Sequence, residues 1–308
     1  MRKTAGVIGV VVQAAALVFV VASARGEDPP PPPSDHWNVQ SDVKYTIAQS
    51  AYSDNWVGGE AGSIAWTLGW NSLAERALAA KLVSRNTAKL AFGQTHTQDK
   101  ESKNWASPAK STDLIDLESL ERMPTGKLVD PFFALRLESQ FVDASDPTKT
   151  RIVNPMLLTE SAGVARVLEH AEDRDWTLRL GFAVRQRIDR DAPVQEGSVI
   201  QRKTETTNDG GLTFVSDRSR PLSKSIKWAN KLTVFQALFS SAKDDLKGTP
   251  RADYWQSPDV NLENMFTADV AKYVIVSLYN QLLYDKEIDK GGRFKHTLSA
   301  GLTYKLKG

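Results

Sequence analysis

The sequence predicts an all-β protein, a transmembrane antiparallel up-and-down β-barrel of about twelve strands. Apolar and polar residues alternate with a period of two along much of the chain after residue 40, as in strands with two unlike faces. The clear runs have roughly the 9–11 residues that a tilted strand needs to cross a membrane. The connections between them are alternately short and long, which is typical of outer-membrane barrels.

The clearest strand covers residues 176–189, WTLRLGFAVRQRID. One parity is almost wholly apolar, and the other carries Arg179, Arg185 and Arg187. A soluble sandwich would place the apolar face in its core. A membrane barrel would turn the apolar face to lipid and the polar face to its lumen. The number of such strands and the way they are joined distinguish the two folds.

Similar patterns recur along the chain. In residues 64–71 isoleucine, tryptophan and leucine alternate with small or polar residues, and in 133–141 phenylalanine and leucine alternate with alanine, arginine and glutamate. In 296–306 leucine and tyrosine alternate with threonine, serine and lysine. The runs at 43–52, 160–169 and 206–218 are less regular. The twelve expected strands are 43–52, 64–71, 87–95, 112–123, 133–141, 160–169, 176–189, 206–218, 226–239, 262–270, 274–284 and 296–306.

The expected connections separate into two sets. If the N-terminus lies in the periplasm, the periplasmic turns are short and fall near 81–86, 124–129, 170–175, 221–225 and 271–273. Four connections on the other side are long and fall near 98–111, 143–158, 190–203 and 241–259. A Greek-key sandwich has no reason to alternate loop length so regularly. The connections therefore favour the membrane barrel.

The N-terminus predicts export. Arg2 and Lys3 precede an apolar run from Ala5 to Val21, and Ala22-Ser23-Ala24 fits the small-residue cleavage rule. An uncleaved anchor helix is the alternative. The expected division is a signal peptide at 1–24, a proline-rich periplasmic lead at 25–40 and a barrel at 41–308, which places the protein in the bacterial outer membrane after cleavage near Ala24.

The composition excludes several chemistries. The chain has no cysteine, so disulfides, thiol catalysis and zinc–thiolate sites are excluded. Loss of the signal leaves equal numbers of acidic and basic residues, and no basic excess indicates nucleic acid. The four histidines lack ligand-like spacing, so we expect no metal and no cofactor. A Ser–His hydrolase could use His296 with Ser299, or His96 with Ser277, but nothing in their spacing supports it, and we expect no enzyme.

Charged residues recur on the face expected to line the lumen. Opposite charges are interleaved there, so cross-strand ion pairs are expected between neighbouring strands. One interpretation is a lumen filled by these side chains, and the other is a narrow pore whose arginines favour anions. The interleaving favours the filled lumen. The lumen-facing candidates are Asp116, Glu118, Arg136, Glu138, Arg179, Arg185 and Arg187.

Aromatic residues stand beside the expected short turns. Trp176 opens one strand, Trp228 stands near the start of another, and Phe133 and Tyr273 are placed similarly. Each alone would suit an ordinary core. Their shared position predicts an aromatic girdle at the periplasmic membrane interface.

A glycine-rich segment between the first two strands carries a family resemblance. Asn55-Trp56 and Gly58-Gly59-Glu60 lie in SDNWVGGEAGS, which is similar to a signature of the bacterial proteins grouped as domain of unknown function 3078. The segments 130–141 and 154–163 resemble the same group, and residues 262–304 also resemble salt-induced outer-membrane proteins. The resemblance implies an outer-membrane-type barrel with no established activity. The residues themselves predict a tight hairpin connection, with a ligand-binding loop as the alternative.

The predicted function is a narrow channel or a passive structural membrane protein without enzymatic activity. Two alternatives are a barrel that acts in adhesion through its long outer loops and a soluble periplasmic binding barrel. The expected partners are outer-membrane lipid and the barrel-assembly machinery that inserts such proteins. The chain ends in Lys305-Leu306-Lys307-Gly308, without the terminal aromatic residue that barrel proteins commonly carry.

Overall fold

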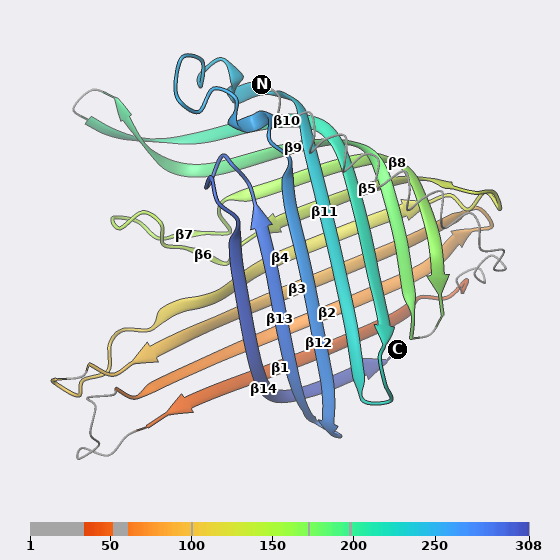
Figure 1. Ribbon diagram of the computed structural model, residues 1–308, viewed down its shortest axis with the longest axis horizontal. Helices are drawn as coiled ribbons and strands as arrows, with labels where there is room; N and C mark the ends of the chain where they lie inside the picture. The colour runs from red at the N-terminus through yellow and green to blue at the C-terminus, as the bar shows by residue number, and fades with distance from the viewer. Residues whose placement is uncertain (1–33, 52–60, 100, 172, 197–198, 308) are drawn as a thin grey trace.

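Twelve antiparallel strands close into a barrel in the computed structural model (Figure 1). It describes all residues except 1–33, 52–60, 100, 172, 197–198 and 308. The barrel strands are β1 (Asn38–Ser50), β2 (Ser63–Ala79), β3 (Leu82–Thr97), β4 (Ala109–Arg122), β5 (Asp130–Ser139), β8 (Met156–His170), β9 (Asp175–Glu196), β10 (Val199–Pro221), β11 (Ile226–Ser240), β12 (Asp259–Ala271), β13 (Val274–Tyr284) and β14 (Arg293–Lys307).

Each barrel strand pairs with its neighbours in the chain, and β1 closes the cylinder against β14. The predicted fold class is therefore confirmed, and each of the twelve expected strands corresponds to one barrel strand. Gln40 pairs with Lys307, so the start of β1 and the end of β14 lie at the same end of the barrel. The short turns between β2 and β3 and between β12 and β13 lie at this end as well.

The other end of the barrel carries most of the additional structure. A small hairpin, β6 (Val142–Asp143) with β7 (Arg151–Ile152), lies between β5 and β8, and the short 3₁₀ helices η1 (Ser241–Lys243) and η2 (Tyr254–Gln256) lie between β11 and β12. Figure 1 shows β6, β7 and the joined ends of β9 and β10 projecting from this end. We call it the loop end and the opposite one the turn end.

The prediction of a long loop at 190–203 is wrong. β9 and β10 continue as a paired hairpin beyond the rim, with Pro193 opposite Arg202. Proline suggests a loop because it cannot donate to a ladder, but each strand of a two-stranded hairpin has a free edge on which the missing N–H costs nothing. A register shift between Lys203 and Glu205 and the left-handed backbone of Asp191 (φ 54°) absorb the irregularity.

The exposure pattern of the strands is that of a protein whose apolar side faces outward. On β9 the side chains of Leu180 and Phe182 are 40% and 43% exposed, whereas those of Ala183 and Arg179, on the opposite face of the strand, are 1% and 6% exposed. Leu68, Leu135, Leu212 and Leu302 are exposed in the same way on other strands. Water would penalise such a belt, and hydrocarbon would not. The barrel is therefore of the transmembrane type, and the soluble periplasmic alternative is wrong.

Glycines allow the barrel wall to bend across β8 to β10. Gly163 of β8 pairs with Gly181 of β9, and a Cβ built on Gly181 would lie 2.4 Å from the carbonyl oxygen of Ala162. Neighbouring backbones approach closely here, as expected where a sheet curves sharply to close a barrel.

Candidate functional site

A cluster of ion pairs lies at the middle of the lumen, where β4 and β5 face its interior. The guanidinium of Arg136 donates to both carboxylate oxygens of Asp116, with Nε–Oδ1 and Nη2–Oδ2 distances of 2.8 and 3.0 Å. The Nη2 atom also lies 3.0 Å from Oε1 of Glu138. These residues alternate with outward-facing leucines, so the pairing of β4 with β5 brings them together.

Glu118 connects this cluster to the opposite wall of the barrel. One of its carboxylate oxygens contacts Arg179 of β9, and Oε2 accepts a 3.0 Å hydrogen bond from Nζ of Lys231 on β11. Between β4 and β11 the barrel order contains β5, β8, β9 and β10, so the contact with Lys231 crosses the lumen. The sequence pattern did not indicate Lys231, because pairings between non-neighbouring strands leave no periodic signal.

The central cluster, defined as Asp116, Glu118, Arg136, Glu138, Arg179 and Lys231, is largely withdrawn from solvent. The side chains of Glu118, Arg179 and Lys231 are only 10%, 7% and 9% exposed. The cluster contains three carboxylates and three cations, so its formal charge is zero. Buried charges require such pairing because their desolvation is costly. The arginine face is thus neutralised at this depth.

An apolar layer lies between the central cluster and the turn end. Leu120, Phe132, Ala134 and Ala165 form a buried group in which the most exposed side chain, Leu120, is 9% exposed. Beyond it, Arg85 of β3 contacts Asp175 of β9 across the lumen. These residues border a cavity of about 20 Å³, which is roughly the space that one water molecule needs.

A third layer of side chains lies toward the loop end of the lumen. Trp255 of η2 is 8% exposed and packs with Ala183, Phe235 and Ala237. The guanidinium of Arg185 lies 3.6 Å from the ring centroid of Phe235 and 2.7 Å from a carboxylate oxygen of Asp259. Arg187, one step further along the same parity of β9, is exposed. Contacts across the lumen therefore occur at two depths, through Glu118 and through Arg85, and the third layer includes a side chain from a loop.

The predicted interface aromatics stand on the outer surface near the turn end. The guanidinium of Arg218 lies 4.3 Å from the ring of Trp176 and 5.6 Å from that of Trp228. Tyr273 stacks on Tyr304 with ring centroids 6.4 Å apart, and Phe133 is 48% exposed. Amphipathic rings at one height on the surface suit the boundary between lipid and water.

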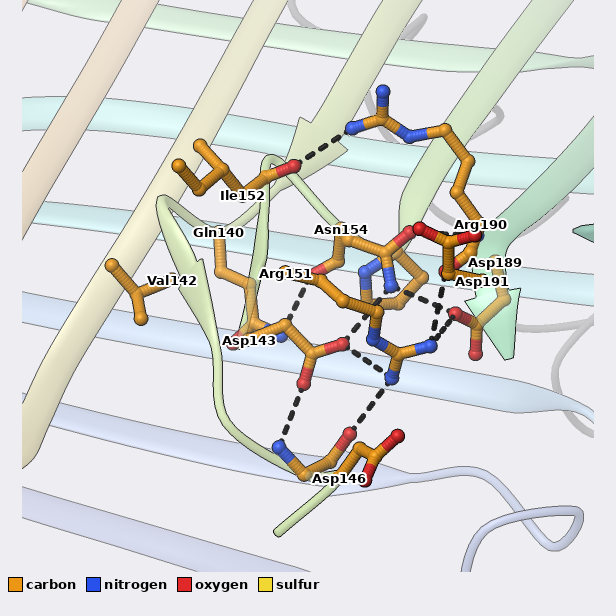
Figure 2. A network of polar contacts seen from close by, with 12 residues as sticks. Gln140, Val142, Asp143, Asp146, Arg151, Ile152, Asn154, Asp189, Arg190 and Asp191 are labelled. Carbon is orange, nitrogen blue, oxygen red and sulfur yellow. Dashed lines mark hydrogen bonds and ion pairs between the residues drawn. The ribbon is translucent and has the colours of Figure 1, made fainter. Parts of the chain in front are cut away.

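A second polar network, which the sequence did not reveal, joins the β5–β8 connection to β9 (Figure 2). The guanidinium of Arg151 on β7 lies 2.7 Å from a carboxylate oxygen of Asp143 and 2.7 Å from one of Asp189. The amide of Asn154, which is fully buried, donates to the same two carboxylates at 3.0 and 2.7 Å. The backbone N–H of Arg190 donates to Oδ1 of Asn154 at 2.8 Å. We call these residues, with Arg190, the outer network.

Hydrogen bonding and charge keep carboxylates of this connection ionised. Two hydrogen bonds from Thr148 and one from Arg202 lower the pKa of Asp146 to about 2. At Asp143 burial acts to raise the pKa, but hydrogen bonds from Asn154 and Ser145 and the charge of Arg151 outweigh it and lower the pKa. The only sequence signals were Asn154, within a family segment, and Asp189, on the polar parity of its strand.

The other candidates are either separated or undescribed. His296 hydrogen-bonds to Asn280 at 2.8 Å, and it lies on the face of β14 opposite to that of Ser299. The motif residues Asn55, Trp56, Gly58, Gly59 and Glu60 lie outside the described residues. Within the described part of the chain no three His, Cys, Asp or Glu side chains are grouped to hold a metal ion. No helix in that part is both long and apolar enough to span a membrane.

Comparison with known protein families shows a match over part of this chain. A family model described as "Protein of unknown function (DUF3078)" matches residues 47–144, which confirms the resemblance to that group over this part of the chain. No curated protein matches the chain in sequence.

Several solved barrels are similar to this chain at low identity. The COG4313 outer membrane channel from Pseudomonas putida F1 is 14% identical, with 92% of this chain and 99% of that chain covered and a TM-score of 0.41. The translocator domain of the autotransporter NalP from Neisseria meningitidis is 9% identical, with 97% of each chain covered and a TM-score of 0.37. The NanC porin is 9% identical, with 87% of this chain and 100% of that chain covered and a TM-score of 0.34.

Proposed function

We propose that this protein is exported by a signal peptide cleaved near Ala24 and spans the bacterial outer membrane. The proline-rich lead and the short turns then lie in the periplasm, and the outer network faces outward. The basic start, the apolar run and the small residues at 22–24 support export. The outward apolar belt supports membrane insertion, for which the barrel-assembly machinery is the expected partner. Cell fractionation tests the location, and recovery of the chain in the soluble periplasmic fraction would contradict it.

We propose that the barrel serves as a closed structural element that displays its loop end, without enzymatic activity. The observation that supports this role best is the contact of Glu118 with Arg179 and Lys231 across the lumen. Buried apolar side chains border the lumen on both sides of that contact. A permanently hydrated pore would instead require a continuous polar path.

The direct test is reconstitution of the mature chain into a planar lipid bilayer. We expect no conductance steps across voltage and salt concentration, because buried ion pairs cross the lumen at two depths. Heat-modifiable gel mobility of the reconstituted sample controls for correct folding. Stable conductance steps from the unmodified, folded protein would overturn the closed barrel.

A gated channel is the second candidate, and it rests on the origin of the third layer. Trp255 belongs to the connection between β11 and β12, so this side chain can leave the lumen without rupture of the barrel wall. A gated channel predicts frequent conductance steps after Trp255→Ala, whereas a closed barrel stays silent because two layers remain. The same variant therefore distinguishes the two functions.

A further inference from the structure

We propose that the loop end carries a binding site for a phosphate group, centred on Arg190. The site is a cavity of about 350 Å³ between residues 149–154, which include β7, and the β9–β10 hairpin. Three cationic side chains and one carboxylate line it, together with hydroxyl and amide groups. The lining residues are Lys149, Thr150, Arg151, Ile152, Asn154, Arg190, Asp191 and Thr204.

Arg190 differs from the other cations of this region in its partners. Arg151 is paired with Asp143 and Asp189, Arg202 with Asp146, and Lys149 with Asp191. The Nη2 atom of Arg190 instead donates to the neutral carbonyl oxygens of Ile152 and Val153, at 2.7 and 2.8 Å. These two bonds, of which Figure 2 shows the one to Ile152, orient the guanidinium without neutralising its charge.

The geometry suits a tetrahedral oxyanion. With Nη2 bound to the two carbonyl oxygens, Nε and Nη1 of Arg190 remain as donors, and the guanidinium stays charged at every physiological pH. Thr150 and Thr204 add hydroxyl groups to the cavity wall, and Lys149 adds a second, mobile cation. The outer network holds the backbone of Arg190 in place through the hydrogen bond from its N–H to the buried Asn154.

The carboxylate of Asp191 competes with phosphate for the ammonium group of Lys149. Its carboxylate accepts a 2.8 Å contact from Nζ of Lys149, and the two side chains are 53% and 46% exposed. Such an exposed pair contributes little stability, so an incoming phosphate can replace the carboxylate beside Lys149. Asparagine tolerates the left-handed backbone at this position, so Asp191→Asn removes the competing charge without strain.

Two sources of the phosphate are compatible with the position of the cavity. One is inorganic phosphate from the medium. The other is the phosphate head group of a lipid in the outer leaflet, because Ile152 beside the guanidinium is 70% exposed and offers an apolar contact for a lipid. The lipid source rests on the proposed outer-membrane location, whereas binding of phosphate by the purified chain does not.

Calorimetric titration of inorganic phosphate into the mature chain, in neutral detergent at constant ionic strength, tests the site. We expect saturable binding that weakens at least tenfold in Arg190→Gln, is partly retained in Arg190→Lys and tightens several-fold in Asp191→Asn. Lys247→Gln, an exposed lysine outside the cavity, is the matched control and should bind as the parent does. Absence of saturable binding to both phosphate and lipid, or equal binding by all variants, would overturn the site.

Native mass spectrometry with phosphatidic acid and diacylglycerol then distinguishes the sources. Retention of phosphatidic acid but not of diacylglycerol, lost in Arg190→Gln, supports the lipid head group. Binding of inorganic phosphate alone supports the free anion. Neither result depends on conductance or on fractionation, so failure of the site and failure of the proposed function are separate outcomes.

Discussion

Glu118 is the carboxylate that balances two buried cations from the opposite wall, Arg179 and Lys231. Glu118→Ala leaves both without this partner in a site of low polarity. We expect a loss of about 3–5 kcal/mol in the free energy of unfolding, the range measured when one member of a buried pair is removed. Urea unfolding in lipid vesicles, followed by tryptophan fluorescence, measures the change.

The control for this prediction is Glu101→Ala, which removes the same charge from an exposed position outside the barrel wall. Its effect should stay within about 0.5 kcal/mol. Equal free energies of unfolding for the two variants would show that the contacts across the lumen contribute nothing to stability.

At the residue scale, the sequence predicted contacts between neighbouring strands and missed those between distant ones. The period-two pattern placed Asp116 and Arg136 on the lumen side of consecutive strands, and in the structure they contact each other diagonally across β4 and β5. Nothing in the pattern specified that Glu118 meets Lys231, because contacts between opposite walls depend on how all twelve strands assemble. Asn154 was missed because a single buried amide in a connection has no periodicity.

At the scale of the element, the pairing of β8 with β9 depends on the close approach of their backbones. A Cβ on Gly181 would meet the carbonyl oxygen and carbon of Ala162 at 2.4 and 2.9 Å, and backbone cannot move aside as a flexible side chain can. Gly181→Ala should therefore force β8 and β9 apart and reduce the folded fraction, seen as loss of heat-modifiable mobility.

Gly291→Ala provides the matched comparison. The nearest atom to its added Cβ is a carboxylate oxygen of Asp289 at 3.3 Å, which can rotate away. This variant should fold as the parent does. Similar folding yields for both alanine variants would show that the wall bends without the help of Gly181.

The connection between β5 and β8 should loosen in acid. Hydrogen bonds lower the pKa of Asp146 to about 2, below its ordinary value of 3.8, so the stabilising contribution of this carboxylate is fully present above pH 4. It is lost as the pH falls through about 2, because protonation removes the charge that Arg202 and Thr148 bind.

A spin label at Thr150 measures this loosening, and the absence of native cysteine makes the labelling specific. We expect the mobility of the label to increase as the pH falls from 4 to 2. Asp146→Asn should show the increased mobility already at neutral pH. A label whose mobility is independent of pH in the parent would contradict the role of Asp146.

At the scale of the element, the sequence predicted the strands better than the connections. Alternation extends over several residue pairs in a strand and leaves a signal even where one pair is irregular. The β9–β10 extension was missed because Pro193 is typical of loops, and its tolerance in a two-stranded hairpin depends on a free edge that only the assembled structure has.

The whole molecule depends on hydrocarbon around the barrel wall. Leu180 points outward from β9 and is 40% exposed, between Trp176 near the turn end and Ile188 near the rim. Leu180→Arg places a charge near the middle of the belt. It should lower the free energy of unfolding in lipid vesicles by about 2–4 kcal/mol, the depth-dependent cost for arginine in a membrane barrel.

The decisive comparison is with Thr206→Arg, because Thr206 pairs with Ile188 close to the rim, where the same charge reaches head groups and water. There the cost should fall to about 0–1 kcal/mol. If water surrounded the barrel, arginine would be tolerated at both outward positions. If a packed protein core surrounded Leu180, the arginine variant would lose the same free energy of unfolding in detergent and in lipid. A penalty that changes with depth, and that shrinks when short-chain lipid thins the bilayer, is specific to a wall in contact with acyl chains.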